Sequence, residues 1–193
     1  MIKTTNMILQ EINQYASPAD KLSRMVQQGE YIPIRKGLYE TDKTTSGYLL
    51  AGSIYGPSYL SFEFALAIYG LIPEAVYTFT SASFEKKKKK TYVTSFGTFT
   101  YQDVPSKAFP YGLRIRKEKD YFYMIATPEK ALCDQLYKTR PAANYKELED
   151  LLYEDLRMEK QDLKKLSCKD IFILADKYKS TNVKRLKGLM RRL

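Results

Sequence analysis

The sequence predicts an α+β protein, in which a short segment of helices and a β-hairpin precedes an antiparallel sheet bracketed by helices. Apolar residues recur at helical spacing before residue 29 and again after residue 128. Between residues 75 and 126, β-branched and aromatic residues form short runs separated by turn residues. The chain has 193 residues and 44% hydrophobic residues, which allows a small module joined to a larger one. The polar stretch 42–47 marks the expected boundary between domains 1–45 and 46–193.

The first domain has the pattern helix, turn, helix and tight hairpin. Apolar residues at helical spacing occupy residues 7–15. Ser17 followed by Pro18 is typical of the start of a second helix, which Gly29 ends. Apolar residues alternate on both sides of Arg35-Lys36-Gly37, which predicts a short β-wing. This order is that of a winged helix-turn-helix, here shortened because few residues precede Ser17.

The second domain is expected to begin with a helix over 48–55 and a further helix near residue 60, capped by Ser61. Strands are then expected over 76–80, 92–95, 98–101, 112–116 and 121–125. Thr127-Pro128-Glu129 has the N-cap, proline and acid that open a helix. The remainder is predicted to be helical, with one amphipathic face over 148–156, a helix over 168–178 capped by Ser167, and a last helix striped by apolar residues over 183–190.

Composition argues against most enzyme and metal sites. The chain contains no histidine, the usual general base of serine or cysteine nucleophiles and the commonest zinc ligand. Its two cysteines, Cys133 and Cys168, lie in apolar helical contexts and are expected to be buried free thiols. We therefore expect no catalytic residues, no metal and no cofactor. Without a long apolar run or a signal-peptide pattern, we expect a cytoplasmic protein with no membrane contact.

The net charge of +10 is distributed unevenly along the chain. Residues 1–45 carry six basic and five acidic groups, whereas residues 163–193 carry ten basic groups against two acidic ones. Residues 144–162 are acidic, with three basic groups against seven acidic ones. A basic protein is attracted to polyanions by a salt-sensitive term that does not depend on sequence.

Three motifs occur in order: Arg35–Tyr39 in the predicted wing, Pro57–Pro73 around the helix near residue 60, and Ala126–Asp134 in the helix after the strands. Together they resemble the AbiEi antitoxin family of abortive-infection, type IV toxin–antitoxin systems, over roughly residues 17–140. The resemblance implies a repressor that binds inverted repeats in its own promoter, as a dimer on double-stranded DNA. It also implies an antitoxin domain that counteracts a nucleotidyltransferase-type toxin, without requiring a stable complex, and so a role in phage resistance.

A recognition helix and a wing contact DNA in different ways, because the helix meets base edges and the wing tip meets phosphate. In the second helix the candidates for base contacts are Lys21, Arg24, Gln27 and Gln28. In the wing the candidates for phosphate contacts are Arg35 and Lys36. The alternative is that these are ordinary solvated side chains on a small helix and turn.

Two further basic sets are candidates for phosphate or partner contacts. The first is the run Lys86, Lys87, Lys88, Lys89 and Lys90 between two strands, which could instead keep a strand edge solvated. The second is the basic C-terminal face formed by Lys177, Lys179, Lys184, Arg185, Lys187, Arg191 and Arg192. On that face, Lys184, Lys187 and Arg191 share one side of a helix.

The stretch 128–134 brings two acids and a lysine together but favours a structural interpretation. Glu129 suits the first helical turn, and Lys130 with Asp134 forms an i,i+4 pair that stabilises a helix by a few tenths of a kcal/mol. Ser61, with Tyr59 and Tyr69, is expected to serve helix entry and packing, since no histidine is present to activate it.

Two other classes of protein stay open. Asp103 at a strand end could belong to a nuclease-like fold, but that chemistry needs an acid and a lysine on a neighbouring strand, and the following hairpin offers Arg114-Ile115-Arg116. Alternatively, the protein is an interaction module with a decayed winged helix, whose acidic helix 147–159 docks a basic partner.

Overall fold

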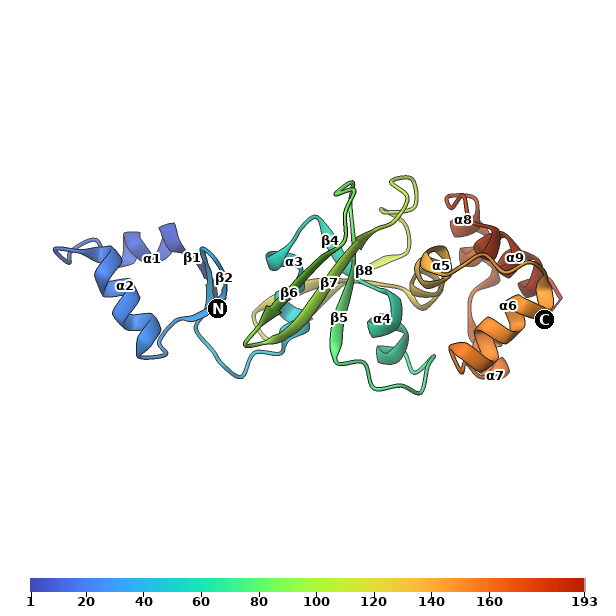
Figure 1. Ribbon diagram of the computed structural model, residues 1–193, viewed down its shortest axis with the longest axis horizontal. Helices are drawn as coiled ribbons and strands as arrows, with labels where there is room; N and C mark the ends of the chain where they lie inside the picture. Colours follow the sequence, from blue (N-terminus) through green and yellow to red (C-terminus); the bar gives the residue numbers. More distant parts are fainter. Residues whose placement is uncertain (193) are drawn as a thin grey trace.

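The computed structural model describes residues 1–192 and shows an α+β protein whose three parts lie in line (Figure 1). A small N-terminal segment lies at one end, a six-stranded sheet in the middle, and a group of helices at the other end. Within residues 1–192, no helix is long and apolar enough to cross a membrane.

The N-terminal segment contains a three-stranded antiparallel sheet and two helices. Its elements are β1 (Ile2–Thr4), α1 (Thr5–Glu11), α2 (Pro18–Gln27), β2 (Ile32–Arg35) and β3 (Leu38–Glu40). The strand order is β1-β3-β2, so the first strand pairs with the outgoing strand of the hairpin. The two helices and the hairpin agree with the sequence prediction, whereas β1 was not predicted because three residues are too short for a periodic pattern.

The small sheet has two buried faces. On one face, Tyr31 packs with Ile8, Ile12 and Leu22 of the helices in a separate cluster. On the other face, residues of the hairpin enter the main hydrophobic core of the chain; these are Ile34 and Leu38. The N-terminal segment is therefore attached to the sheet by apolar contact as well as by the chain.

Glu40 reinforces this attachment. Its fully buried carboxylate accepts a hydrogen bond from the hydroxyl of Tyr121, a residue of the central sheet, at 2.7 Å and is paired with the N-terminal ammonium of Met1. Burial alone raises the pKa of Glu40, but these donors and the backbone amides of Thr41 and Asp42 lower the pKa below its ordinary value. Glu40 is thus held as a carboxylate between the two parts.

The central sheet is mixed, not antiparallel as the sequence predicted. Its strand order is β6-β7-β5-β4-β9-β8, and the pairs β4/β9 and β5/β7 are parallel. The strands are β4 (Ser58–Leu60), β5 (Thr78–Ser83), β6 (Lys90–Thr94), β7 (Gly97–Asp103), β8 (Leu113–Glu118) and β9 (Tyr121–Ala126). The hairpins β6/β7 and β8/β9 were correctly predicted from their turns. The parallel pairs join strands distant in sequence, and no local turn encodes their direction.

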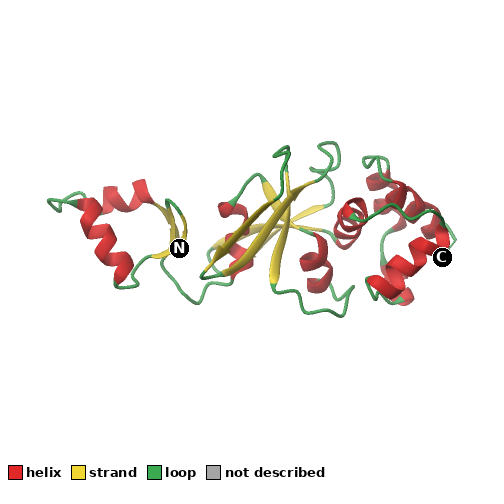
Figure 2. Cartoon of the chain, in the orientation of Figure 1, coloured by secondary structure: helices red, strands yellow, loops and turns green. Residues whose placement is uncertain are grey.

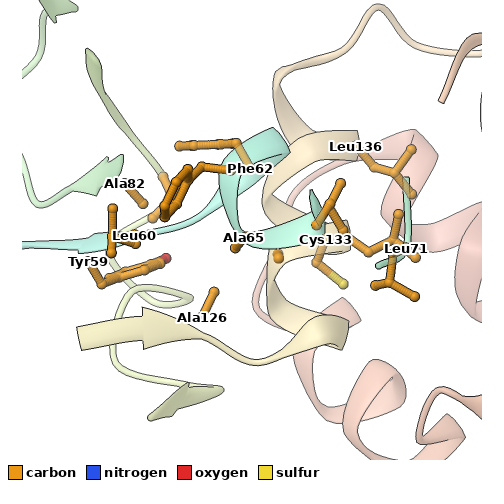
Figure 3. Close-up of a cluster of buried hydrophobic side chains, with 14 of the residues drawn as sticks. Tyr59, Leu60, Phe62, Ala65, Leu71, Ala82, Ala126, Cys133 and Leu136 are labelled. Carbon is orange, nitrogen blue, oxygen red and sulfur yellow. The ribbon is translucent and has the colours of Figure 1, made fainter. Parts of the chain in front are cut away.

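The helix predicted after Ser61 is present as α4 (Phe62–Ile68), but the sequence did not predict that residues 58–60 before it form the strand β4. All three residues of β4 are buried, since the strand lies between β5 and β9. Figure 3 shows Leu60 between Ala82 of β5 and Ala126 of β9, with Phe62 following where the chain turns into the helix. Phe62 makes this turn with a φ of 55°, an uncommon conformation for an aromatic residue.

Helices lie on both sides of the sheet, with strands between the helical groups (Figure 2). The short helices η1 (Gly47–Leu50) and α3 (Ala51–Ile54) contact β9 and β4 on the side toward the N-terminal segment. On the opposite side, α4 packs against β5 and against α5 (Pro128–Lys138). The expected helix over 48–55 is therefore present as two short pieces.

The C-terminal helices pack on α5, which separates them from the sheet (Figure 1). They are α6 (Tyr145–Asp150), a π-helical turn η2 (Leu151–Asp155), α7 (Lys160–Lys165), α8 (Cys168–Ala175) and α9 (Thr181–Met190). The predicted caps are confirmed: the Thr127 side chain accepts from the amide of Lys130, and Ser167 accepts from that of Asp170. Helix α8 ends three residues before the predicted Tyr178, because the chain turns there and directs the Tyr178 side chain into the core.

Only one of the two cysteines is buried. Cys133 lies in the core between α5 and α4, where Figure 3 shows it near Ala65. Cys168 is exposed, so the prediction of two buried thiols was wrong for this residue. The buried face of α8 is formed by Ile171, Leu174 and Ala175, and Cys168, at the first turn, falls outside it.

Candidate nucleic-acid interface and basic cleft

Helix α2 presents a polar face to solvent. Leu22 is its buried residue, and Arg24, Gln27 and Gln28 are exposed on the other side. Lys21 is half-buried, and its ammonium lies 5.1 Å from the centre of the Tyr15 ring. The helix and its C-cap therefore offer the exposed guanidinium of Arg24 and two amides that donate and accept hydrogen bonds.

The turn between β2 and β3 carries the two candidate wing residues, Arg35 and Lys36, both exposed. Gly37 completes the turn with a φ of 81°, which glycine adopts without strain, and its carbonyl accepts a hydrogen bond from the amide of Thr5 at 3.1 Å. Burial raises the pKa of Tyr101 in β7, and the charge of Arg35 acts in the opposite direction. Strand β2, which ends at Arg35, contacts β6 of the central sheet.

The lysine run occupies the connection from β5 to β6, an outer strand of the sheet. Lys87, Lys88 and Lys89 are exposed, whereas Lys86 and Lys90 are half-buried. The backbone amide of Lys87 donates to Asp103 at 2.6 Å, and the Lys86 ammonium lies 5.2 Å from the Tyr55 ring centre. The run is thus a positive loop whose first two residues are held in place and whose last residue begins β6, beside an open strand edge that its charge keeps solvated.

The C-terminal candidates Lys184, Lys187 and Arg191 line one cleft of about 1020 Å³ along α9. Lys179 and Arg185, from the same basic face, line it too, and Tyr145 of α6 also contributes to the lining. Asp176 is the acidic residue of the lining, and its carboxylate lies 2.6 Å from the ammonium of Lys187. Tyr145 was not identified from the sequence, because nothing in its own segment indicates that α6 packs against α9.

A buried polar cluster connects the sheet, α5 and the C-terminal helices. Lys130 and Asp134 of α5 are both fully buried, with their charged atoms 3.1 Å apart. Asp134 accepts hydrogen bonds from the hydroxyls of Tyr59 at 3.0 Å and Ser61 at 2.7 Å. The Tyr178 hydroxyl donates to Asp134 and accepts from Lys130.

The electrostatics of this cluster suit a structural role. Burial lowers the pKa of Lys130, and the neighbouring carboxylate opposes that shift. The Lys130 ammonium also donates to the Ala108 carbonyl at 3.0 Å and lies 4.7 Å from the Tyr178 ring centre. Burial likewise raises the pKa values of Tyr59 and Tyr178 well above their usual value. These groups satisfy one another inside the core, with no side chain open to a substrate.

Two sequence predictions on this cluster need correction. Lys130 and Asp134 do form an i,i+4 pair, but it is buried rather than a surface pair that merely supports the helix. Ser61 occupies the predicted N-cap position of α4, but its side chain makes no capping hydrogen bond, because its hydroxyl donates to Asp134 instead. Both errors have one cause: the position of α5 against β4 is decided by tertiary packing.

Asp103 does not lie beside the hairpin with which the nuclease-like alternative paired it. Its strand, β7, has β6 and β5 as neighbours, whereas Arg114-Ile115-Arg116 lies in β8 at the far edge of the sheet. The Asp103 carboxylate accepts hydrogen bonds from the Ser83 hydroxyl and the Lys87 amide, both at 2.6 Å. Among residues 1–192, no group of three or more histidine, cysteine or acidic side chains is arranged to hold a metal ion.

Comparison with known proteins adds no family assignment. The chain matches no protein-family model. No curated protein matches its sequence either.

Proposed function

We propose that this protein is a cytoplasmic antitoxin of the AbiEi type that represses its own operon and counteracts a nucleotidyltransferase-type toxin. In this proposal the N-terminal segment is a shortened winged helix-turn-helix, and its second helix, α2, is the recognition helix. The antitoxin activity resides in the sheet and the C-terminal helices.

One observation carries the DNA-binding part of the proposal: the order β1–α1–α2–β2–β3 with the sheet order β1-β3-β2. A winged helix-turn-helix needs a helix pair supported by a hairpin, with a strand before the pair joined to that hairpin. The exposed Arg24, Gln27 and Gln28 are suited to base edges, because arginine pairs with guanine and glutamine with adenine. Arg35 and Lys36 at the turn are suited to phosphate.

The remaining basic groups support binding to a polyanion. Lys87, Lys88 and Lys89 are free of ion pairs in the part of the chain that the structure describes, as is Lys184. In this proposal these lysines lie outside the recognition helix α2 and add contacts to DNA phosphate or to the toxin. Two copies of the protein would occupy the two halves of an inverted repeat.

The test measures binding of the purified full-length protein to a duplex from its own upstream region, by fluorescence anisotropy at several salt concentrations. Arg24→Ala is expected to weaken specific binding by about 5- to 150-fold, the loss of about 1–3 kcal/mol that follows from one base contact. Arg35→Ala and Lys36→Ala should each reduce the slope of log K against log salt by about 1. Arg140→Ala, an exposed arginine outside the N-terminal segment, is the matched control.

Point variants are better suited to this test than deletion of residues 1–45. Ile34 and Leu38 belong to the main core, and Glu40 bonds Tyr121, so deletion would expose buried surface on the remaining domain. In cells that carry the toxin, Arg24→Ala should release repression and leave protection intact. Absence of salt-dependent binding to the promoter duplex, or loss of protection in a folded Arg24→Ala variant, would refute this division of roles.

A second candidate function is that of a protein-interaction module without DNA binding. The observation that favours it is the acidic surface of α6 and η2, where Glu147, Asp150, Glu154 and Asp155 are exposed. Replacement of Glu154 and Asp155 by glutamine and asparagine should abolish capture of a basic partner in this case. The same variant should leave promoter binding unchanged if the first proposal holds.

A further inference from the structure

The cleft along α9 concentrates positive charge around one hollow. Five cations line it, namely Lys179, Lys184, Arg185, Lys187 and Arg191, against the single carboxylate of Asp176. The lining therefore carries a net charge of +4 in a volume of about 1020 Å³. A concave surface of one charge raises the local concentration of ligands of opposite charge.

The cations are not neutralised by the protein itself. Lys187 pairs with Asp176, but Lys179 and Lys184 are exposed and form no ion pair within residues 1–192. The guanidinium of Arg191 lies over the Phe172 ring, 5.2 Å from its centre, a contact that leaves its edge donors available. Most of the positive charge can thus be met only by a ligand or solvent.

Arg185 is the most informative residue of the lining. Its Nη2 atom donates to the Ala143 carbonyl at 2.5 Å, which fixes the plane of the guanidinium. Its Nη1 atom is buried and has no hydrogen-bond partner. Buried polar atoms are nearly always paired, and an orphan calls for an explanation such as an absent ligand.

The walls of the cleft include the start of α9 and an aromatic residue, Tyr145. The Ser180 side chain caps α9, a ten-residue helix whose first turn contributes a partial positive charge. Gly188 allows the Tyr145 hydroxyl to approach α9 closely, since a Cβ atom there would overlap it. The Arg192 guanidinium lies 4.2 Å from the centre of the Tyr145 ring and packs on one face of that ring.

We propose that this cleft binds the phosphate chain of a nucleoside triphosphate. A triphosphate carries several negative charges within a few bonds, which matches five convergent cations better than the single charge of a peptide carboxylate or a phosphodiester. Arginine and lysine together provide both bidentate and point-charge contacts to phosphate. The terminal phosphate of a free nucleotide can enter a cleft of this kind, whereas a duplex phosphate is flanked by sugars on both sides. The proposal concerns the C-terminal helices and does not depend on DNA binding by the N-terminal segment.

The test uses the full-length protein and measures binding of ATP, tripolyphosphate and inorganic phosphate by isothermal titration calorimetry at low and physiological salt. The cleft variant is Lys179→Gln/Lys184→Gln, since both side chains are exposed and their loss should leave the fold intact. The matched control, Lys43→Gln/Lys107→Gln, removes two exposed lysines outside the cleft. Thermal unfolding of each variant without ligand verifies that the fold is unchanged.

ATP should bind the wild type and the control equally and bind the cleft variant at least tenfold more weakly. Arg185→Gln should have a similar effect on ATP binding. Equal affinity of the cleft variant and the control would overturn the proposal, as would binding of tripolyphosphate without binding of ATP. It would also be overturned if the cleft variant lost affinity for promoter DNA while the wild type bound no ATP. In that case the cleft belongs to a DNA surface.

Discussion

The buried pair of Lys130 and Asp134 allows a direct test of the central architecture. Lys130→Met removes the charge and keeps most of the volume of the side chain. The Asp134 carboxylate then stays buried without its cation. It retains three hydroxyl donors, from Tyr59, Ser61 and Tyr178.

The expected loss follows from this geometry. Breaking a buried ion pair by removal of one partner costs about 3–5 kcal/mol, and the three remaining donors favour the lower end, about 3 kcal/mol. For a chain of this length each kcal/mol lowers Tm by about 2–4 °C, so the expected decrease is about 6–12 °C. An exposed i,i+4 pair would contribute only about 0.2–0.5 kcal/mol. The two environments are therefore clearly separable.

The assay is urea unfolding followed by circular dichroism, with a double-mutant cycle. The double variant Lys130→Met/Asp134→Leu should be less destabilised than the sum of the single variants by about 2 kcal/mol, because no uncompensated charge is left. Lys165→Met breaks the exposed pair with Asp162 and serves as a control that should change stability by less than about 0.5 kcal/mol. If Lys130→Met lowered the free energy of unfolding by less than about 1 kcal/mol, the reasoning would be refuted.

Three further predictions follow from other contacts. Burial raises the pKa of Glu63, but Lys138, whose ammonium lies 2.5 Å away, acts together with a backbone amide and Gln135 to bring this pKa below its ordinary value. The stability of the Glu63–Lys138 pair is therefore present above the unfolded pKa and is lost as pH falls through the lower folded pKa. Glu63→Gln should therefore be destabilising by about 0.5–1 kcal/mol at neutral pH and nearly neutral at about pH 3, and an equal difference in urea midpoint at both pH values would contradict this. Gly188→Ala should destabilise the protein by about 1–3 kcal/mol, because the added Cβ atom overlaps the Tyr145 hydroxyl. In thermal unfolding, the added substitution Tyr145→Phe should recover part of that loss. Stabilisation by Gly188→Ala would show that the space beside Gly188 is free. A thiol reagent should modify Cys168 alone in the native protein and both cysteines in denaturant, and rapid native modification of two thiols would contradict the packing of α5.

The N-terminal segment shows how much local pattern can predict. Ser17, Pro18 and Gly29 mark the limits of α2 in the sequence, and the structure places the helix between them. The hairpin at Gly37 is equally local, because a turn and two short strands lie within one stretch of chain. The docking of Ile34 on the main core has no such signal, since its partners are far away in sequence.

The candidate site was found in part. The shared face of Lys184, Lys187 and Arg191 follows from helical periodicity alone, and the structure places all three on one cleft. That Tyr145 faces the same hollow could not be predicted, because α6 meets α9 through tertiary packing between segments that are distant in sequence.

What the sequence by itself determined is the set of local elements: the α+β class, the caps at Thr127 and Ser167, the hairpins and the basic face of the last helix. Each depends on residues within a few positions of one another, where backbone preference and periodicity act directly. Only the tertiary structure decided the mixed order of the sheet, the position of β4 and the burial of Lys130 with Asp134. These depend on contacts between distant segments, where the free energy of desolvation and packing outweighs any local preference.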